Sequence, residues 1–166
     1  NEEKYIGRLL VALSQQTYML EKIEVIIADG GSKDKTISII EDFNSNKPKF
    51  IIKIIHNPKK SIPSGVNLAI NASSGEIIIR MDAHSVPDKN YIFFCVEDLF
   101  ENKGVNVGGL WLIKPGEDNW ISKSIALAAA HPFGVGDTKY RYSQKASYVD
   151  TVPFGAFYRS LFDKIG

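Results

Sequence analysis

Short apolar segments alternate with amphipathic segments along this chain. The apolar runs at 23–28, 50–55 and 77–81 are rich in Ile and Val, and they are as short as buried strands of a parallel sheet. Between them, 36–43 and 63–72 carry apolar residues at helical spacing. Strands that alternate with helices predict an α/β fold, in which helices cover the faces of a parallel sheet.

The chain opens on a pattern that predicts a helix. Asn1 is followed by Glu2 and Glu3, which is typical of a helix N-cap with acidic residues in the first turn. The apolar face that follows consists of Ile6, Leu9, Leu10 and Leu13. We therefore expect a helix that is capped by Asn1.

The second half of the chain is less regular. Turn-forming residues with little periodicity fill 131–147, which predicts a mobile loop over the site. Apolar periodicity predicts further helices over 91–102, 120–130 and 158–165, and further strands over 106–113 and 148–152.

Composition limits the classes of protein that the chain can represent. The 166 residues are 44% hydrophobic, which suffices for the core of one domain, and the net charge of +1 comes from interspersed charges, so no basic stripe indicates nucleic-acid binding. The single cysteine, Cys95, excludes a disulfide within the chain and fits a reducing, cytoplasmic setting. No apolar stretch reaches the ~20 residues of a membrane span, and the N-terminus lacks a signal-peptide pattern. Peripheral contact with a membrane stays open.

Two acidic clusters follow predicted strands. Asp29-Gly30-Gly31-Ser32 comes directly after the strand at 23–28, and the cluster at 80–84 comes at the end of the strand at 77–81. The carboxyl ends of parallel strands lie on one edge of a sheet, where open α/β proteins bind ligands. Asp29 and Asp82 are therefore expected to face one crevice.

Asp82 and His84 are candidate metal ligands. Residues two apart in an extended strand point the same way, so a carboxylate and an imidazole could meet one cation. A site with two protein ligands is completed by water and phosphate oxygens, as is usual for Mg²⁺ or Mn²⁺, and the nitrogen ligand favours Mn²⁺. The alternative is that Asp82 caps a turn and His84 is a solvated loop residue.

Asp29 is a candidate ligand-binding residue. The two glycines that follow it let the backbone turn tightly and approach a ligand, and its carboxylate could accept a hydrogen bond from a base or a ribose. The alternative is an Asx-turn that only shapes the loop. Lys59, Lys60 and Arg80 are candidate phosphate partners.

Several blocks carry a family resemblance, because they occur together in one order. Residues 1–6, 28–36 and 75–84 resemble glycosyltransferase family 2, and the resemblance extends over nearly the whole chain. The Arg-Met-Asp-Ala-His block at 80–84 and the block at 148–157 resemble the succinoglycan-type exopolysaccharide branch, which has His where most relatives have a second Asp.

The resemblance implies a GT-A fold, which is a Rossmann-like, mostly parallel sheet with flanking helices. It also implies a nucleotide-diphosphate sugar donor, with a UDP-sugar favoured, a divalent metal (Mn²⁺ or Mg²⁺), and inversion at the anomeric carbon. Asp29 matches the acid that binds base or ribose. Asp82 matches the first acid of the DxD motif, near ribose and metal, so it counts with the nucleotide-sugar-binding residues as well as the metal ligands, and His84 takes the place of the metal-binding second acid. Asn67 matches an Asn beside the donor, and Arg80 belongs to the same donor site.

The chain departs from the family pattern at both ends. The family begins with a strand before the block at 1–6, so we expect an empty sheet position and one nucleotide-sugar-binding domain over 1–166, truncated at both ends. The resemblance places the catalytic base beyond Gly166. Asp137 and Asp150 are internal acids, and neither is assigned that role.

The sequence thus predicts a glycosyltransferase that transfers a sugar to a glycan or lipid-linked saccharide in polysaccharide biosynthesis, in the cytoplasm or at the inner face of the membrane. Two alternatives remain open, a non-catalytic module that binds nucleotide sugar or metal, and a nucleotidyltransferase.

Overall fold

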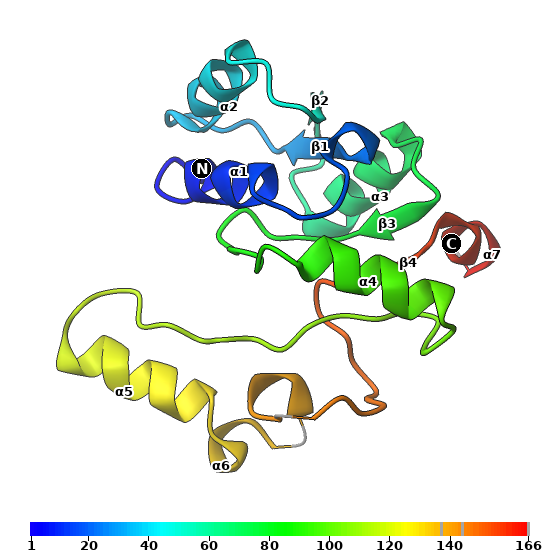
Figure 1. The fold of residues 1–166 in the computed structure, drawn as a ribbon. Coiled ribbons are helices and arrows are strands. Elements are labelled where there is room, and N and C mark those ends of the chain that lie inside the picture. The colour runs from blue at the N-terminus through cyan, green and yellow to red at the C-terminus, as the bar shows by residue number, and fades with distance from the viewer. Residues whose placement is uncertain (137, 144, 166) are drawn as a thin grey trace.

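A parallel pair of strands forms the centre of the fold. The computed structural model describes residues 1–136, 138–143 and 145–165. Strand β1 (Glu24–Asp29) pairs in parallel with β2 (Ile51–His56), and the register runs from Glu24 opposite Ile51 to Asp29 opposite His56. A second pair, β3 (Ile77–Ile79) and β4 (Ala156–Tyr158), is antiparallel. Both pairs can be followed in Figure 1.

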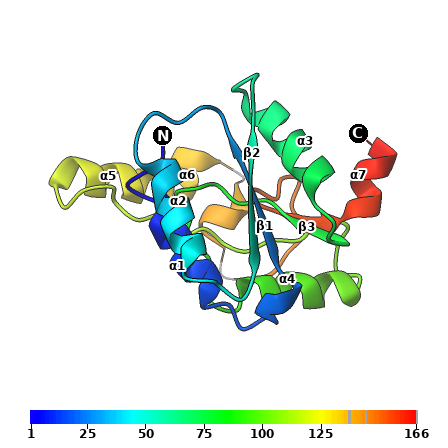
Figure 2. The same cartoon turned by 90° about the horizontal axis from the view of Figure 1, so that it is seen from above.

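Helices cover both sides of the β1–β2 pair. Figure 2 shows α1 and α2 on one side of these strands and α3 on the other. The helices are α1 (Ile6–Ser14), α2 (Thr36–Ser45), α3 (Ile62–Ala72), α4 (Tyr91–Phe100), α5 (Trp120–Ala129), α6 (Pro132–Val135) and α7 (Arg159–Ile165), with short 3₁₀ turns at Leu20–Lys22 and Lys139–Arg141. This arrangement confirms the α/β class and most of the helices expected in the first hundred residues.

The main core joins the N-terminal helix to the sheet and to α4. Leu10 and Ile40 are completely buried, and they belong to one cluster with Phe50, Ile92 and Val96. These residues come from α1, α2, the start of β2 and α4, so the cluster connects four separate segments. A smaller cluster joins α4 to the second sheet through Cys95, Leu99, Val107 and Ala156.

The two strand pairs are separate in the described part of the chain. No strand ladder joins β1 to β3, so β1 pairs only with β2, and β3 pairs only with β4. The strand expected at 77–81 ends at Ile79, because pairing with β4 stops opposite Ala156. The edge of β1 that faces away from β2 thus carries no strand among these residues.

The prediction that Asn1 caps the first helix is wrong. Helix α1 begins at Ile6, and Tyr5 occupies the N-cap position without a side-chain hydrogen bond. Asn1 Oδ1 instead accepts the backbone N–H of Lys33 at 2.8 Å, and Glu3 Oε2 accepts that of Lys35 at 3.0 Å. Asn1 and Glu3 therefore bind the loop after β1. They stabilise this distant loop and do not cap α1.

The predictions of strands at 106–113 and 148–152 are also wrong. A single bridge pairs Val107 with Ala156, and the ladder then stops. A Cβ atom at Gly108 would lie 2.6 Å from Cγ1 of Val152, and one at Gly109 would lie 3.0 Å from Cε2 of Tyr91. Both glycines therefore pack closely against other segments, which takes the place of strand pairing.

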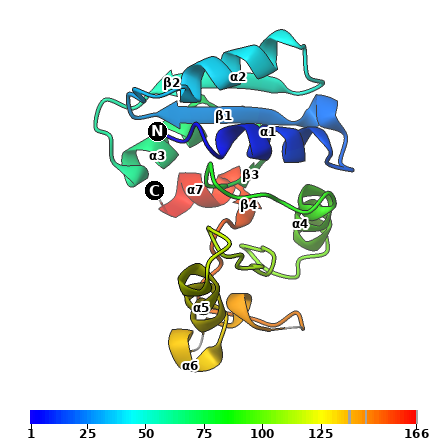
Figure 3. The same cartoon turned by 90° about the vertical axis from the view of Figure 1, so that its left-hand side faces the viewer.

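Residues 108–152 form what we call the extension. Figures 1 and 3 show its helices α5 and α6 well apart from the β1–β2 pair. The 131–147 segment, expected to be a loop, contains α6 and a 3₁₀ turn. On α5 only Ala126 is buried, and Trp120 is 76% exposed. No helix of the described residues is long and apolar enough to cross a membrane.

Arg159 fastens the C-terminal segment to α3. Its Nη2 donates to the carbonyl of Ile70 at 3.0 Å and also to Ser73, and its Nε donates to the carbonyl of Gly75 at 3.1 Å. A cation beside the last turn of α3 complements the helix dipole, and it adds a donor to the Ile70 carbonyl, which already accepts from the backbone N–H and the hydroxyl of Ser73.

The core predicts that substitutions of two neighbouring residues of α1 change the free energy of unfolding by very different amounts. Leu10→Ala should lower the free energy of unfolding by about 2–5 kcal/mol, because it opens a cavity where the side chain is fully buried. Val11 is 48% exposed, so Val11→Ala should change the free energy by no more than about 0.5 kcal/mol. Urea denaturation of both variants checks this, and equal losses would contradict the core described here.

Glu24 predicts a specific dependence of stability on pH. Burial alone would raise its pKa, but hydrogen bonds from the amides of Ser74 and Gly75, the Ser74 hydroxyl and the Lys53 ammonium lower the pKa from 4.5 to about 2. A lowered folded-state pKa stabilises the fold above pH 4.5, and this contribution is lost as the pH falls toward 2.

The measurement is the free energy of unfolding between pH 5 and the acid limit of folding, for the wild type and for Glu24→Gln. The variant should be less stable at pH 5 and should lose less stability on acidification. Glu41→Gln, on the exposed surface of α2, is the control for the change in charge. Parallel curves for the wild type and Glu24→Gln would contradict the prediction.

Candidate functional site

The candidate site residues Asp29 and Asp82 lie at the end of β1 and shortly after β3. Asp29 is the last residue of β1 and pairs with His56, the last residue of β2. The backbone N–H of Asn57 donates to the carbonyl of Asp29 at 2.7 Å, which extends the ladder by one bond. The carboxyl ends of both parallel strands thus form one edge, where α/β proteins bind ligands.

The Asp29 carboxylate holds its own loop. Its oxygens accept the backbone N–H of Gly31 at 2.8 Å, the N–H of Ser32 at 3.0 Å and the Ser32 hydroxyl at 2.6 Å. This is the Asx-turn expected as the alternative to ligand binding. Burial raises the pKa of Asp29, but the hydrogen bonds from Ser32 and Gly31 outweigh it, and the net pKa is lowered. Three donors leave room for one more at a carboxylate, which offers about four lone-pair sites.

Asn57 is a buried residue of this edge that the sequence did not single out. It is only 4% exposed, its Nδ2 donates to the carbonyl of Ser61 at 3.0 Å, and its Oδ1 has no hydrogen-bond partner in the described residues. An Asn before a Pro directly after a strand was the available signal. Asn57 joins the end of β2 to the start of α3.

Asp82 and His84 lie in a turn after β3, so the extended geometry expected for 82–84 is wrong. The backbone N–H of Ser85 donates to the carbonyl of Asp82 at 3.0 Å, and the Ser85 hydroxyl donates to the same oxygen at 2.7 Å. The ring of exposed His84 meets the ring of Tyr5 edge-on at 6.4 Å. The turn forms because pairing with β4 ends at Ile79.

The donor chemistry of this turn fits a divalent cation. The Asp82 side chain is 35% exposed, and its carboxylate lies 3.3 Å from Nη2 of Arg80. A carboxylate and an imidazole are suitable ligands for Mn²⁺, and a carboxylate also suits Mg²⁺. The described residues contain no group of three or more His, Cys, Asp or Glu that could hold a metal. Asp82 and His84 would therefore hold a cation only together with oxygens of water or of a substrate.

Arg80 lies between the Asp82 carboxylate and an aromatic row. Its guanidinium is 5.9 Å from the ring centroid of Phe154, which stacks on Trp111 at 4.7 Å. The guanidinium of Arg141 lies 5.4 Å from the Trp111 ring on the extension. Cation–π contacts of this kind stabilise by about 0.5–2 kcal/mol each. This row connects the extension to the end of β3, and no sequence pattern indicated it.

Asn67 lies on α3, the helix that contacts β1. It is exposed on α3, and its side chain makes no hydrogen bond within the described part of the chain.

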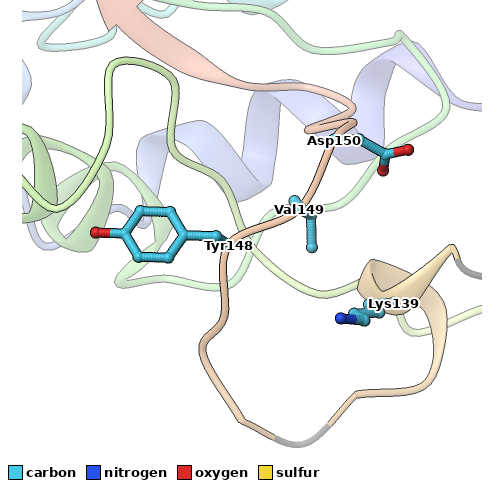
Figure 4. A pocket seen from close by; sticks show the side chains of 4 residues that line it. All are labelled: Lys139, Tyr148, Val149 and Asp150. Carbon is cyan, nitrogen blue, oxygen red and sulfur yellow. The ribbon is translucent and has the colours of Figure 1, made fainter.

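A hollow of about 360 Å³ opens in the extension and is lined by Lys139, Tyr148, Val149 and Asp150. Figure 4 shows the side chains of Tyr148 and Asp150 pointing in different directions. Among the described residues that line the hollow, Asp150 is the acid. Asp137 lies outside the described residues.

Relatives with known names match most of the chain. The chain is 28% identical, over 162 residues, to the dolichyl N-acetyl-alpha-D-glucosaminyl phosphate 3-beta-D-2,3-diacetamido-2,3-dideoxy-beta-D-glucuronosyltransferase of Methanococcus voltae, a match that covers 95% of this chain and 50% of that protein. It is 29% identical over 98 residues to the chondroitin synthase of Escherichia coli, covering 59% of this chain and 14% of the synthase. The chain thus spans half or less of the length of these relatives.

Solved structures share the fold. A fragment of Staphylococcus aureus TarS in complex with UDP superposes with a TM-score of 0.66 at 18% identity, covering 99% of this chain and 46% of that one. The mannosyltransferase PcManGT of Pyrobaculum calidifontis, in complex with GDP-Man and Mn²⁺, gives 0.67 at 20% identity, covering 97% and 42%. These likenesses confirm the GT-A arrangement expected from the sequence.

A family model covers the chain completely, since the match to glycosyl transferase family 2 extends over residues 1–166. Together with the parallel strands, the flanking helices and the acidic residues after β1 and β3, this match establishes that the chain belongs to glycosyl transferase family 2.

Proposed function

We propose that this chain is the donor-binding part of a glycosyltransferase that transfers a sugar from a nucleotide-diphosphate sugar to a saccharide or lipid-linked acceptor. The observation that carries the proposal is the match to family 2 over residues 1–166. The position of Asp29 at the shared edge of β1 and β2 supports it, because open α/β sheets bind ligands at this edge. We treat residues 1–166 as one nucleotide-sugar-binding domain.

A UDP-sugar is the proposed donor, and polysaccharide biosynthesis is the proposed process. TarS has been solved with UDP and with UDP-GlcNAc, whereas PcManGT has been solved with GDP-Man and Mn²⁺. Several relatives are named for polysaccharides, including the chondroitin synthase of Escherichia coli and the hyaluronan synthase of Pasteurella multocida. The Arg-Met-Asp-Ala-His block supports the finer assignment to the succinoglycan-type exopolysaccharide branch.

We assign nucleotide binding to one group of residues and metal binding to another. Asp29 and Asn67 contact the nucleoside part of the donor, and Arg80 donates hydrogen bonds to its diphosphate. Asp82 and His84 would hold Mn²⁺ or Mg²⁺, which would neutralise the charge that grows on the leaving diphosphate. An acceptor hydroxyl attacks the anomeric carbon from the face opposite to the diphosphate, which inverts the configuration. No described residue is assigned as the base that deprotonates this hydroxyl.

We also propose a cytoplasmic location at the inner face of the membrane, where a lipid-linked acceptor would be reached by peripheral contact. The free, buried thiol of Cys95 supports a reducing compartment.

Calorimetric titration tests the metal site. UDP should bind the wild type more tightly in the presence of Mn²⁺ than in its absence, and His84→Ala and Asp82→Asn should weaken the Mn²⁺-dependent binding by about tenfold or more, because each removes a ligand. His131→Ala, on the extension, is the control for loss of an imidazole. Mn²⁺-dependent binding that survives both substitutions would exclude this pair as the metal site.

Asp29 should show a double effect, because its carboxylate also holds the loop. Asp29→Ala leaves the N–H groups of Gly31 and Ser32 without their acceptor, so the free energy of unfolding should fall by about 1–3 kcal/mol together with the affinity for UDP. Ser32→Ala removes one donor and keeps the carboxylate.

This second variant separates the two roles. Ser32→Ala should cost stability by about 1 kcal/mol and should leave the dissociation constant of UDP within a few-fold of the wild-type value. If Asp29→Ala lowered stability and still bound UDP like the wild type, the carboxylate would have only its structural role.

A further inference from the structure

Lys60 has a backbone conformation that lysine rarely adopts. Its φ is +54°, in the left-handed region that favours glycine. For a residue with a side chain this conformation costs about 1–2 kcal/mol. Lys47, Asn102 and Phe154 also have a positive φ, and strained residues of this kind cluster at functional sites. The conformation of Lys60 is therefore maintained by its surroundings.

The β1–β2 edge holds Lys60 in place. The backbone N–H of Lys60 donates to the carbonyl of Asn57 at 3.1 Å, and the N–H of Asn57 donates to the carbonyl of Asp29 at 2.7 Å. The buried side chain of Asn57 then binds the carbonyl of Ser61 at 3.0 Å. Lys60 is thus fixed on both sides by a residue that is only 4% exposed.

The side chain of Lys60 runs along the two glycines that follow β1. A Cβ atom at Gly30 would lie 3.6 Å from Cα and 3.9 Å from Cγ of Lys60, and one at Gly31 would lie 3.9 Å from its Cε. The aliphatic part of Lys60 therefore lies beside the Asp29 loop over its whole length. Gly31, with φ of +89°, keeps this side of the loop free of side chains.

The ammonium group of Lys60 is uncommitted. It makes no hydrogen bond or ion pair within the described residues, although it sits beside the loop of Asp29, whose oxygens are engaged by Gly31 and Ser32. Other lysines of the chain do pair, as Lys53 does with Glu24 at 3.2 Å and Lys103 with Asp98 at 2.8 Å. An exposed cation, held in a strained position at the ligand-binding edge, is suited to bind an anionic or carbonyl oxygen.

We propose that Lys60 is a donor-binding residue whose ammonium group donates to an oxygen of the nucleoside diphosphate, either on a phosphate or on the carbonyl of the base. This inference rests on the proposed function, because the ligand is the nucleotide of the sugar donor. The glycines at 30 and 31 would let the nucleotide approach the backbone closely beside this cation.

Calorimetric titrations of UDP and uridine into the 166-residue chain test the role of Lys60. Lys60→Met should raise the dissociation constant of UDP about tenfold, equivalent to about 1.4 kcal/mol, and Lys60→Arg should stay close to the wild type. Lys49→Met, at the opposite end of β2, is the control for loss of an exposed lysine. A phosphate contact predicts a loss of affinity for UDP and not for uridine, whereas a base contact predicts equal losses for both.

A glycine variant separates binding from folding. Lys60→Gly relieves the left-handed strain, so its melting temperature should equal or exceed that of the wild type, while its affinity for UDP should fall as in Lys60→Met. If the wild type binds UDP and both variants bind it equally well, the role of Lys60 is overturned. If the wild type binds neither UDP nor GDP with Mn²⁺, the proposed function itself fails, and the role of Lys60 with it.

Discussion

Strand β1 carries a carboxylate at each end, and each carboxylate accepts backbone N–H groups of an adjoining loop. At the amino end, Glu24 binds the amides of Ser74 and Gly75, and so fixes the loop between α3 and β3. At the carboxyl end, Asp29 binds the amides of Gly31 and Ser32. Both pKa values are lowered, because the ionised form is the one that the amides stabilise. The loops at both ends of β1 thus depend on the charges of two carboxylates in this one strand.

The proposed donor site depends on the second of these loops. The Asx-turn of Asp29 sets the path of Gly30 and Gly31, and their bare backbone leaves the space in which the side chain of Lys60 lies. Asn57 fixes Lys60 from the other side through the ladder of β1 and β2. The Asp29 carboxylate therefore organises a surface to which β2 and Lys60 also contribute.

The sequence predicted the parts of the fold that depend on local pattern. The strands 24–29 and 51–56 and the helices next to them lie within about two residues of their expected bounds, because strand and helix periodicity are local properties. The expected strand at 106–113 failed because Gly108 and Gly109 pack against Val152 and Tyr91, and such long-range contacts leave no trace in periodicity.

The candidate site was predictable in position and less so in geometry. The strand ends placed Asp29 and Asp82 correctly in the chain, but an Asp-Gly-Gly-Ser segment is compatible with both an Asx-turn and a ligand-binding loop. The turn at Asp82 depends on where β4 stops pairing, which the local sequence does not encode. The left-handed conformation of Lys60 was also hidden, because lysine gives no signal for it.

The β3–β4 pair has a consequence for the order in which the molecule folds. It brings residue 77 next to residue 158, so it closes a loop that contains α4 and the whole extension. The entropy of closing a loop must be overcome before its contacts form, whereas β1 and β2 are joined by one helix and close a much shorter loop. The N-terminal half can therefore fold first. Arg159 then binds the end of α3, and β4 pairs with β3. Opening of these contacts would leave the β1–β2 ladder in place, because no ladder joins β1 or β2 to β3 or β4 in the described residues.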